Sequence, residues 1–335
     1  MKKINILVIG ISLLLVTSCH KKNRFEIDTN ENRYPVKIQR FDKDLLSLDP
    51  KNMDKGLKKL YASYPDFLGL FAFEIMDTSA KDTSAMKSLI TKFLTDTAFV
   101  KSNKKALETF SNISDIEKEL SDAFSYIHYY FPEVKLPELY FFVSGFNQQI
   151  IMNNKLIALG TDFYLGNDYP RYKGIAYNYQ IENMRRECVA TDLVSATLFR
   201  MFRMNSSQYR LLDNMLFRGK VLYLMSAFMP NENHESIIGY TTEQQKWCKT
   251  NEKQIWASII DQNHLFSTDV MLIKKYMNDA PFTATISQES PGRVGTWIGF
   301  QIVESYMKHN PAISLRDLMN DNNYQKMLEQ SDYRP

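Results

Sequence analysis

Hydrophobic residues recur with a helical period over most of the chain, so the sequence predicts a helix-rich protein. The first such helix, over residues 55–64, is expected to end at Pro65. Ser114 is expected to cap the helix over 114–131, with Glu117 completing a capping box. Helical patterns are found over 55–64, 84–94, 96–108, 114–131, 180–204, 207–229, 242–262, 270–276, 295–309 and 314–319.

Strand-like patterns are short and fall mostly in the middle of the chain. Residues 38–42 alternate between apolar and polar, and residues 139–144 and 149–152 are rich in β-branched and aromatic side chains. A further strand over 156–160 follows the turn at Asn153 and Asn154. The predicted fold class is therefore α+β, predominantly helical with a small β-sheet in the middle of the chain. We found no internal repeat or linker, so residues 36–335 are expected to form a single helix-rich globular domain.

The first residues have the pattern of a bacterial export signal. A short basic start precedes an apolar run over 4–16, which is shorter than the roughly 20 residues that cross a bilayer. Residues 16–19 (Val-Thr-Ser-Cys) resemble a lipobox, in which the cysteine thiol receives diacylglycerol. Residues 1–18 are thus predicted to be a lipoprotein signal peptide, cleaved between Ser18 and Cys19, with Cys19 as the lipid attachment site. The alternatives are an uncleaved anchor helix and an ordinary signal peptide.

Composition and charge narrow the classes of protein further. Hydrophobic residues make up 44% of the chain and aromatic residues 13%, which is typical of a globular protein. Outside the signal, 39 basic residues face 38 acidic ones, so there is no electrostatic case for nucleic-acid binding. The polar residues 19–35 predict a flexible membrane tether. Cys188 and Cys248 either pair in an oxidising compartment or remain buried thiols.

No recognisable catalytic motif accompanies this fold. Of the five histidines, no two are spaced to form HExxH, and no GxSxG elbow or glycine-rich phosphate loop is found. Glu187 and Asp192, five residues apart, do not share one helix face. Gly292 and Gly295 flank Arg293 in a turn that is expected to lead into a helix. The sequence thus predicts no metal, no cofactor and no enzyme activity; the histidines are His20, His128, His234, His264 and His309.

A series of short phrases, in order along nearly the whole mature chain, resembles the gliding-motility lipoprotein family GldB of Bacteroidetes-type bacteria. One departure is Thr161, where the family more often has an apolar residue before the aspartate. The phrases are Ile38–Asp42, Tyr64–Phe67, Phe131-Pro132, Leu136-Pro137, Ala158–Gly166, Gly219–Tyr223, Gly239–Thr241, Trp247-Cys248, Asn251–Trp256, Pro291–Arg293, Gly295–Gly299, Ile302–Met307 and Ser331–Pro335.

The resemblance implies a cell-envelope lipoprotein needed for gliding, tied to machinery that drives surface adhesins alongside the type IX secretion system. It also implies a distant, degenerate likeness to zincin-like peptidases, whose active helix carries HExxH. In one register of the helix expected over 180–204, residues 186–190 (Arg-Glu-Cys-Val-Ala) take the place of that motif. Both histidine ligands are then missing and only Glu187 remains, so no zinc would be held.

The leading hypothesis is a non-catalytic interaction or assembly factor of the motility machinery. It would be tethered to a membrane through a palmitate-type lipid on Cys19 and would have envelope motility proteins as partners. The absence of an acidic run or an aspartate after Cys19 favours the periplasmic face of the outer membrane. The alternatives are an envelope hydrolase related to zincin-like peptidases and a lipoprotein that binds lipid or cell wall. Trp297 and Tyr240 are candidate partner contacts, although burial in the core is the expectation.

Overall fold

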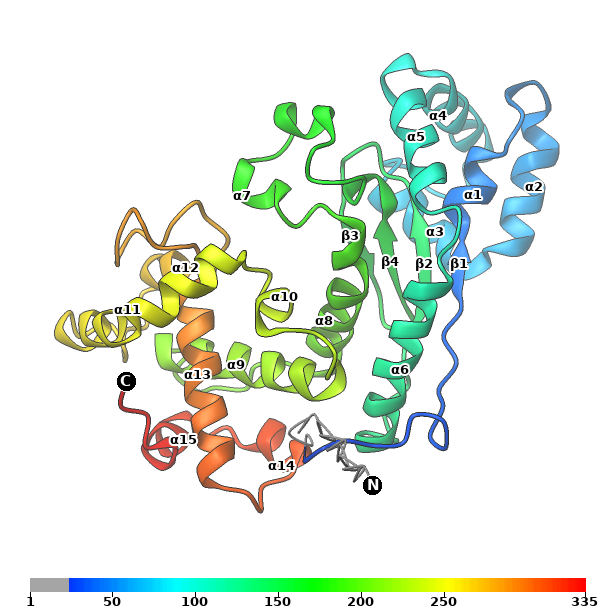
Figure 1. Cartoon of the computed structure of the whole chain (residues 1–335). Coiled ribbons are helices and arrows are strands. Elements are labelled where there is room, and N and C mark those ends of the chain that lie inside the picture. Colours follow the sequence, from blue (N-terminus) through cyan, green and yellow to red (C-terminus); the bar gives the residue numbers. More distant parts are fainter. Residues whose placement is uncertain (1–23) are drawn as a thin grey trace, which may run out of the picture.

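The computed structural model describes residues 24–335 (Figure 1), so Ser18, Cys19, His20 and the predicted signal lie outside the described residues. The prediction of a predominantly helical α+β fold with a small sheet is confirmed. The helices are α1 Phe41–Leu46, α2 Met53–Ser63, α3 Pro65–Glu74, α4 Thr83–Thr95, α5 Thr97–Thr109, α6 Ser114–Tyr130, α7 Asn178–Ile181, α8 Val189–Met201, α9 Leu211–Phe228, α10 His234–Ile238, α11 Thr242–Asp261, α12 Val270–Met277, α13 Val294–His309, α14 Leu315–Asn320 and α15 Tyr324–Ser331. Single 3-10 turns are η1 Pro50–Asn52, η2 Thr161–Phe163, η3 Pro170–Gly174 and η4 Arg186–Cys188.

The four predicted strands form one mixed sheet in the order β1-β2-β4-β3. Strands β1, β2 and β4 run parallel, and β3 is an edge strand antiparallel to β4. Because β3 and β4 are joined by the predicted turn at residues 153–155, they form a hairpin at that edge. The strands are β1 Ile38–Arg40, β2 Glu138–Phe142, β3 Ile150–Met152 and β4 Leu156–Gly160.

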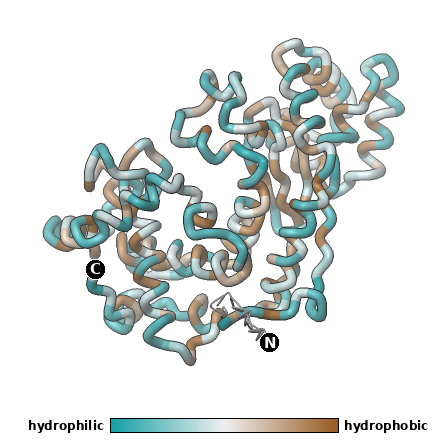
Figure 2. Tube along the Cα trace, viewed as in Figure 1, coloured by the Kyte–Doolittle hydropathy of each residue, from teal (hydrophilic) through white to brown (hydrophobic). Residues whose placement is uncertain are grey.

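The sheet separates two hydrophobic cores, since neighbouring side chains of a strand point to opposite faces. On β2, Leu139 and Phe141 face the larger core with α6, α8, α9 and α13. Tyr140 and Phe142 face the smaller core, which α1 to α5 cover. Figure 1 shows the two groups of helices on opposite sides of the sheet, and Figure 2 shows that the strands and the inner helices carry most of the apolar positions.

A buried aspartate fixes the loop that leaves β2. Asp162 accepts hydrogen bonds from the backbone amides of Ser144 and Phe146, at 3.2 and 2.7 Å. Gly145 and Phe146 both have positive φ, which lets the loop turn sharply around the carboxylate. The loop and the η2 turn that carries Asp162 are therefore locked to each other at one end of the sheet.

Helices α9 and α13 cross in direct backbone contact. A Cβ atom added to Gly219 would lie 2.3 Å from the carbonyl oxygen of Gly299. One added to Gly299 would lie 1.9 Å from the carbonyl oxygen of Met215. Both helices are buried on nearly all sides, which is why their sequences are apolar around the whole circumference. Only glycine allows the two backbones to approach this closely.

Two local predictions are wrong, the first because tertiary contacts replace local ones and the second because of the position of a proline. The helix expected over 180–204 is interrupted: α7 ends at Ile181, and Arg185 is extended before η4. Asn183 and Arg186 instead bond outside the segment, to Gly239 and to Asp115. The prediction missed α3 because Pro65 occupies its first turn, where proline is tolerated, rather than only ending α2.

The predicted capping box of α6 is also wrong. The Ser114 side chain caps nothing, and Ile113 is the N-cap residue. The Glu117 carboxylate accepts hydrogen bonds from the backbone amide of Ile38, at 3.1 Å, and from Lys37, at 2.8 Å. The Glu117 carboxylate, which would have accepted the hydrogen bond of the capping box, is thus bonded to the start of β1 instead.

Residues 19–35 are predicted from the sequence to be a flexible tether. The part of this segment that the structure describes, residues 24–35, lies against the domain instead. Arg24 donates hydrogen bonds to the backbone oxygens of Met307 and Ile313, at 3.0 and 2.9 Å. The Phe25 ring is buried in the larger core. The backbone amide of Tyr34 donates to the hydroxyl of a serine on α6. These residues are therefore part of the folded domain. Among the described helices, none is both long and apolar enough to cross a membrane.

We predict that Gly299→Ala strongly destabilises the protein, by about 3 kcal/mol or more, because the methyl group overlaps the α9 backbone. The matched control is Gly69→Ala in α3, where an added Cβ meets nothing within 4 Å. That substitution is expected to stabilise by about 0.5–1 kcal/mol through the helix preference of alanine. Denaturant unfolding of both variants checks this, and equal stability of the two would contradict the close crossing.

Candidate functional site

The candidate site is a cleft made of two adjoining cavities between α8, α9 and α10. The outer pocket, of about 640 Å³, lies between the N-terminal end of α6, η4 and the α10 region. The inner cavity, of about 130 Å³, lies deeper, against α9 and the start of α13. The two adjoin, because they share five wall residues: Asn183, Cys188, Thr191, Ser236 and Gly239. We call the two together the cleft.

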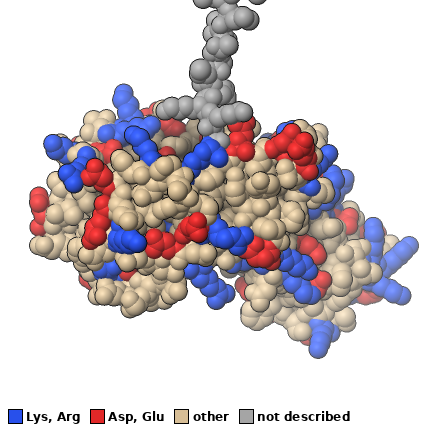
Figure 3. All heavy atoms as spheres, turned by 90° about the horizontal axis from the view of Figure 1, so that it is seen from below, with Lys and Arg blue, Asp and Glu red and all other residues tan. Residues whose placement is uncertain are grey.

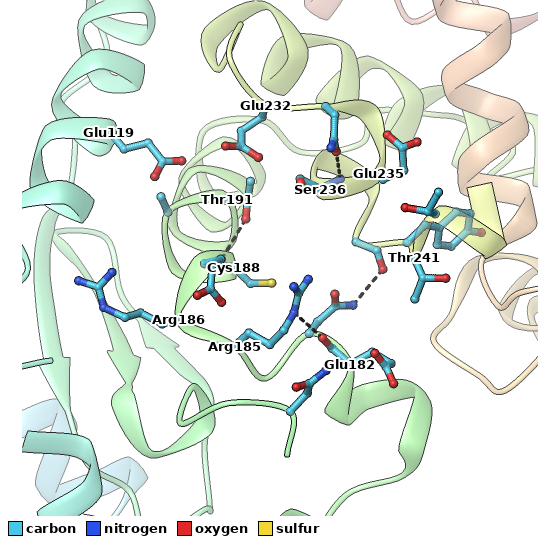
Figure 4. Close-up of a pocket in the computed structure, with 18 of the residues that line it drawn as sticks. Glu119, Glu182, Arg185, Arg186, Cys188, Thr191, Glu232, Glu235, Ser236 and Thr241 are labelled. Atoms are coloured by element: carbon cyan, nitrogen blue, oxygen red, sulfur yellow. Dashed lines mark hydrogen bonds between the residues drawn. The ribbon is translucent and has the colours of Figure 1, made fainter. Parts of the chain in front are cut away.

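The outer pocket is strongly acidic. Its one paired acid is Asp115, which Arg186 holds through two bonds of 2.5 and 2.8 Å, so that the pKa of Asp115 falls to about 2. Arg185 is the only other basic residue on the wall. Figure 4 shows acidic side chains reaching into the pocket from several elements. The remaining acids are Glu119, Glu182, Glu187, Glu232, Glu235 and Glu243.

The pKa of Glu119 shows the effect of this acidic environment. Its carboxylate points across the pocket toward that of Glu232 (Figure 4). Burial, and then repulsion from Glu232 and other acids, raises the pKa of Glu119 to about 7. The outer pocket therefore favours a positively charged group, which would relieve the repulsion.

Helix α8 presents polar side chains to the inner cavity. Thr191, Asp192 and Ser195 line it, at spacing i, i+1 and i+4. The register in which residues 186–190 replace HExxH does not lie within one helix, because Glu187 belongs to the η4 turn and faces the outer pocket. Instead, Thr191, Asp192 and Ser195 on α8 line the inner cavity, and they have the spacing of the His, Glu and His of HExxH.

The floor of the cleft contains a chain of hydrogen bonds. The buried Tyr164 hydroxyl donates to Asp192, at 2.6 Å, and accepts a hydrogen bond from the side-chain amide of Gln149, at 2.9 Å. Burial raises the pKa of Asp192 to about 6, although the bond from Tyr164 and the nearby Arg293 both oppose the rise. Asp192 is thus largely ionised at neutral pH and contributes a negative charge to the cavity wall.

Arg293 lies at the N-cap of α13 in a left-handed conformation, with φ of 59°. This agrees with the predicted turn leading into a helix. Its guanidinium forms an ion pair with the exposed Asp279, at 2.8 Å, and donates to the carbonyl oxygen of Gly239, at 3.1 Å. The turn therefore places a cation on the wall of the inner cavity.

Two polar groups of the inner cavity have no hydrogen-bond partner among the described residues. Arg218, on α9, forms no hydrogen bond or ion pair there, and burial together with the neighbouring Arg293 lowers its pKa. Thr296, on α13, is only 5% exposed, and its hydroxyl has no partner. The nearby Lys220 differs, because its ammonium donates to the carbonyl oxygens of Met319 and Asp321, at 3.3 and 2.8 Å.

The cysteines of the described residues are both free thiols, and no disulfide links Cys188 to Cys248. Cys188 lies at the cleft, but burial and nearby acids raise its pKa to about 11. Burial raises the pKa of Cys248 to about 12. Both thiols are protonated at neutral pH and are therefore poor nucleophiles.

Of the other sequence candidates, Trp297 lies in the core, and Tyr240 lies in the core and also lines the outer pocket. Within residues 24–335, no group of three or more histidine, cysteine or acidic side chains is placed to hold a metal ion. Trp297 is fully buried, and its ring nitrogen donates to Gln245. Tyr240 is 7% exposed and donates to the carbonyl oxygen of Gly292. Both residues are structural, as the preference for burial predicted.

Neither Arg218 nor Thr296 is among the candidate site residues that the sequence suggests. A usable signal was nevertheless present, because Arg218 is a charged residue in a mostly apolar and buried helix, immediately before Gly219. Thr296 likewise stands among buried apolar residues in α13. A polar residue in a helix that is apolar all round needs a partner or a ligand.

Fold and site together define a helix-rich α+β protein with a polar cleft, acidic outside and lined by arginines within. A family model described as gliding motility protein GldB matches residues 22–335. The chain belongs to this family of gliding-motility lipoproteins. No curated protein and no solved structure matched the chain.

We predict that Glu119→Gln stabilises the protein at alkaline pH and not at acidic pH. The pKa of Glu119 is raised in the folded state, so the folded protein keeps a proton that the unfolded chain loses between about pH 4.5 and 7. Stability contributed by this group therefore falls as pH rises through that window. The glutamine variant should melt about 1–3 °C higher at pH 8 and equally at pH 4.

Thermal unfolding across pH 4 to 8 measures this difference. The exposed Glu329 provides the control, because Glu329→Gln should shift the melting temperature equally little at every pH. A difference between wild type and Glu119→Gln that does not change with pH would show that the acid repulsion in the outer pocket is absent.

Proposed function

We propose that this protein is a lipid-anchored envelope component required for gliding motility, and that it acts as a non-catalytic interaction or assembly factor. In this proposal it contacts envelope motility proteins of the machinery linked to the type IX secretion system. The anchor is a lipid on Cys19, and the domain faces the periplasm from the outer membrane. The observation that carries the proposal is the cleft, a formed recess with unpartnered polar groups in a member of a motility family.

The chemistry of the cleft supports recognition more than catalysis. The Cys188 thiol is protonated, and the Asp192 carboxylate already accepts the hydrogen bond from Tyr164. Nucleophilic catalysis requires a nucleophile that is hydrogen-bonded to a general base, and neither Cys188 nor Asp192 is part of such a pair. The acidic outer pocket attracts a positively charged protein segment, as expected for electrostatic recognition of a partner.

Packing of residues 24–35 on the domain shortens the reach from an anchor. Five peptide steps separate Cys19 from Arg24, and an extended chain spans at most roughly 18 Å over that length. A lipidated Cys19 would therefore hold the end of α13 close to the bilayer. In Figure 1 the first described residues, from Arg24 on, lie at the bottom, and α7, beside the cleft, lies toward the top. A partner would thus reach the cleft from the side away from the membrane.

On the face shown in Figure 3, basic and acidic side chains are interspersed and neither sign dominates. This arrangement favours anchoring by lipid over electrostatic attraction to a membrane or a nucleic acid, both of which select basic surfaces.

A peptidase-like hydrolase is a second candidate, favoured by the spacing of the three cavity-facing residues on α8. Their types, threonine, aspartate and serine, supply no imidazole ligand for zinc. Zinc bound to the purified protein, with peptidase activity lost in Asp192→Asn, would favour this candidate instead.

We predict that Cys19→Ser releases the protein from the membrane fraction and abolishes gliding, because a serine hydroxyl does not accept the lipid. Fractionation of cells and metabolic labelling with a palmitate analogue measure the anchor. Cys188→Ser is the control and should leave labelling unchanged. Labelling of the Cys19→Ser variant would place the lipid elsewhere.

We predict that reversing charge in the outer pocket, by Glu232→Lys together with Glu235→Lys, removes partner capture and gliding. Neither glutamate forms an ion pair with a described residue, so the fold should persist at wild-type melting temperature. In-cell crosslinking with identification of captured proteins is the measurement, and Glu329→Lys on α15 is the control. Unchanged capture of motility proteins by the double variant would exclude the outer pocket as the contact.

A further inference from the structure

We propose that the inner cavity is a binding site for one carboxylate group, which Arg218 and Thr296 hold. The inference shares with the proposed function only the view that the cleft binds a ligand. It does not depend on the membrane anchor or on a role in motility.

The inner cavity contains two hydrogen-bond donors without a partner among the described residues. Thr296 is buried, and a buried hydroxyl without a partner costs free energy. Arg218 is only partly buried and contributes an unpaired guanidinium to the cavity wall. Arg218 and Thr296 come from different helices, α9 and α13, yet both line the same small cavity. Lys220, two residues from Arg218, has two backbone acceptors. The fold therefore satisfies a buried cation elsewhere on the same helix and leaves Arg218 open toward the cavity.

The charges on the cavity wall are unequally paired. Asp279 neutralises Arg293 through their ion pair, and Asp192 already accepts a hydrogen bond from Tyr164, so Arg218 is the cation of this wall without a partner among the described residues. A single unpaired cation matches a single carboxylate better than a phosphate dianion. The planar guanidinium of arginine also fits a carboxylate through two parallel hydrogen bonds.

The size of the cavity limits the ligand. A cavity of about 130 Å³ has room for about four water molecules, and thus for a carboxylate with a small substituent but not for a larger ligand. The inner cavity shares wall residues with the outer pocket, such as Cys188 and Thr191, and also with a further recess at Ser195 and Arg293; in the proposal the rest of the ligand extends toward the outer pocket. Because that pocket is acidic, the ligand carries its negative charge at one end and a neutral or positive group behind it.

A carboxylate of this kind is found both on small organic acids and at the C-terminus of a protein segment. Isothermal titration of the purified protein in neutral detergent distinguishes the two. The probes are acetate, inorganic phosphate, N-acetyl-Lys-Ala with a free carboxylate, its C-terminal amide, and N-acetyl-Glu-Ala with a free carboxylate.

We predict that N-acetyl-Lys-Ala binds and that its amide binds at least about 10-fold more weakly. The glutamate peptide should also bind more weakly, because of the acidic outer pocket. Acetate that binds as well as the peptide would support the site with a small organic acid as its source. Equal binding of the amide, tighter binding of phosphate, or no binding of any probe at millimolar concentration would overturn the proposal.

Substitutions place the binding in the inner cavity. Arg218→Met and Thr296→Val should each weaken the peptide, by about 10- to 100-fold for the arginine and less for the threonine. Arg203→Gln, at an exposed arginine just beyond α8, is the matched control and should bind like wild type.

Thermal unfolding of the same variants separates loss of binding from loss of folding. Without ligand, Arg218→Met should melt no lower than wild type, because it removes a partly buried charge that has no partner among the described residues. If Arg218→Met fails to fold, the nearly isosteric Thr296→Val still tests the site. Undiminished binding by Thr296→Val together with a poorly folded Arg218→Met would count against the proposal.

Discussion

The backbone contact between α9 and α13 is the constraint on which the rest of the larger core depends. With glycine at both 219 and 299, the two helices meet without side chains between them. The crossing fixes the rotation of each helix, and so it decides where the neighbouring side chains point. Arg218 directly precedes one glycine, and Thr296 lies one turn before the other, so both line the inner cavity. The same contact that packs the core thus positions the two unpartnered groups.

The cleft is assembled from parts that are distant in the sequence, and each part is fixed by polar bonds of its own. The ion pair of Arg186 with Asp115 ties η4 to α6. Gly239 accepts hydrogen bonds from both Asn183 and Arg293, and thereby joins the α7 region to the start of α13. These bonds occupy one acid and the carbonyl oxygen of Gly239, but most acids of the outer pocket form no ion pair with a described residue. The acids of the outer pocket and the unpaired Arg218 of the inner cavity thus lie at opposite ends of the cleft, an arrangement that would orient a ligand with two unlike ends.

Sequence periodicity predicted the strands and the long helices because those elements satisfy their own backbone hydrogen bonds. The prediction from periodicity failed where a hydrogen bond to a distant segment replaces the expected local one. Glu117 matched a capping box but bonds to the start of β1. Residues 182–188 matched a helix, but the side chains of Asn183 and Arg186 bond to distant segments. The cleft was not predicted, because its walls come from six segments and no local motif marks their meeting.

Polar residues in α9 show why the inner cavity is more than a packing defect. Stability alone favours apolar side chains in a helix that is buried on all sides. Lys220 departs from that rule, but the carbonyl oxygens near the end of α14 compensate for its burial and give it a structural role. Arg218 departs from it without a hydrogen bond or ion pair to any described residue, and it does so beside a second arginine. Its guanidinium lines the inner cavity, so an acceptor that is brought by another molecule would give Arg218 the partner that the fold does not.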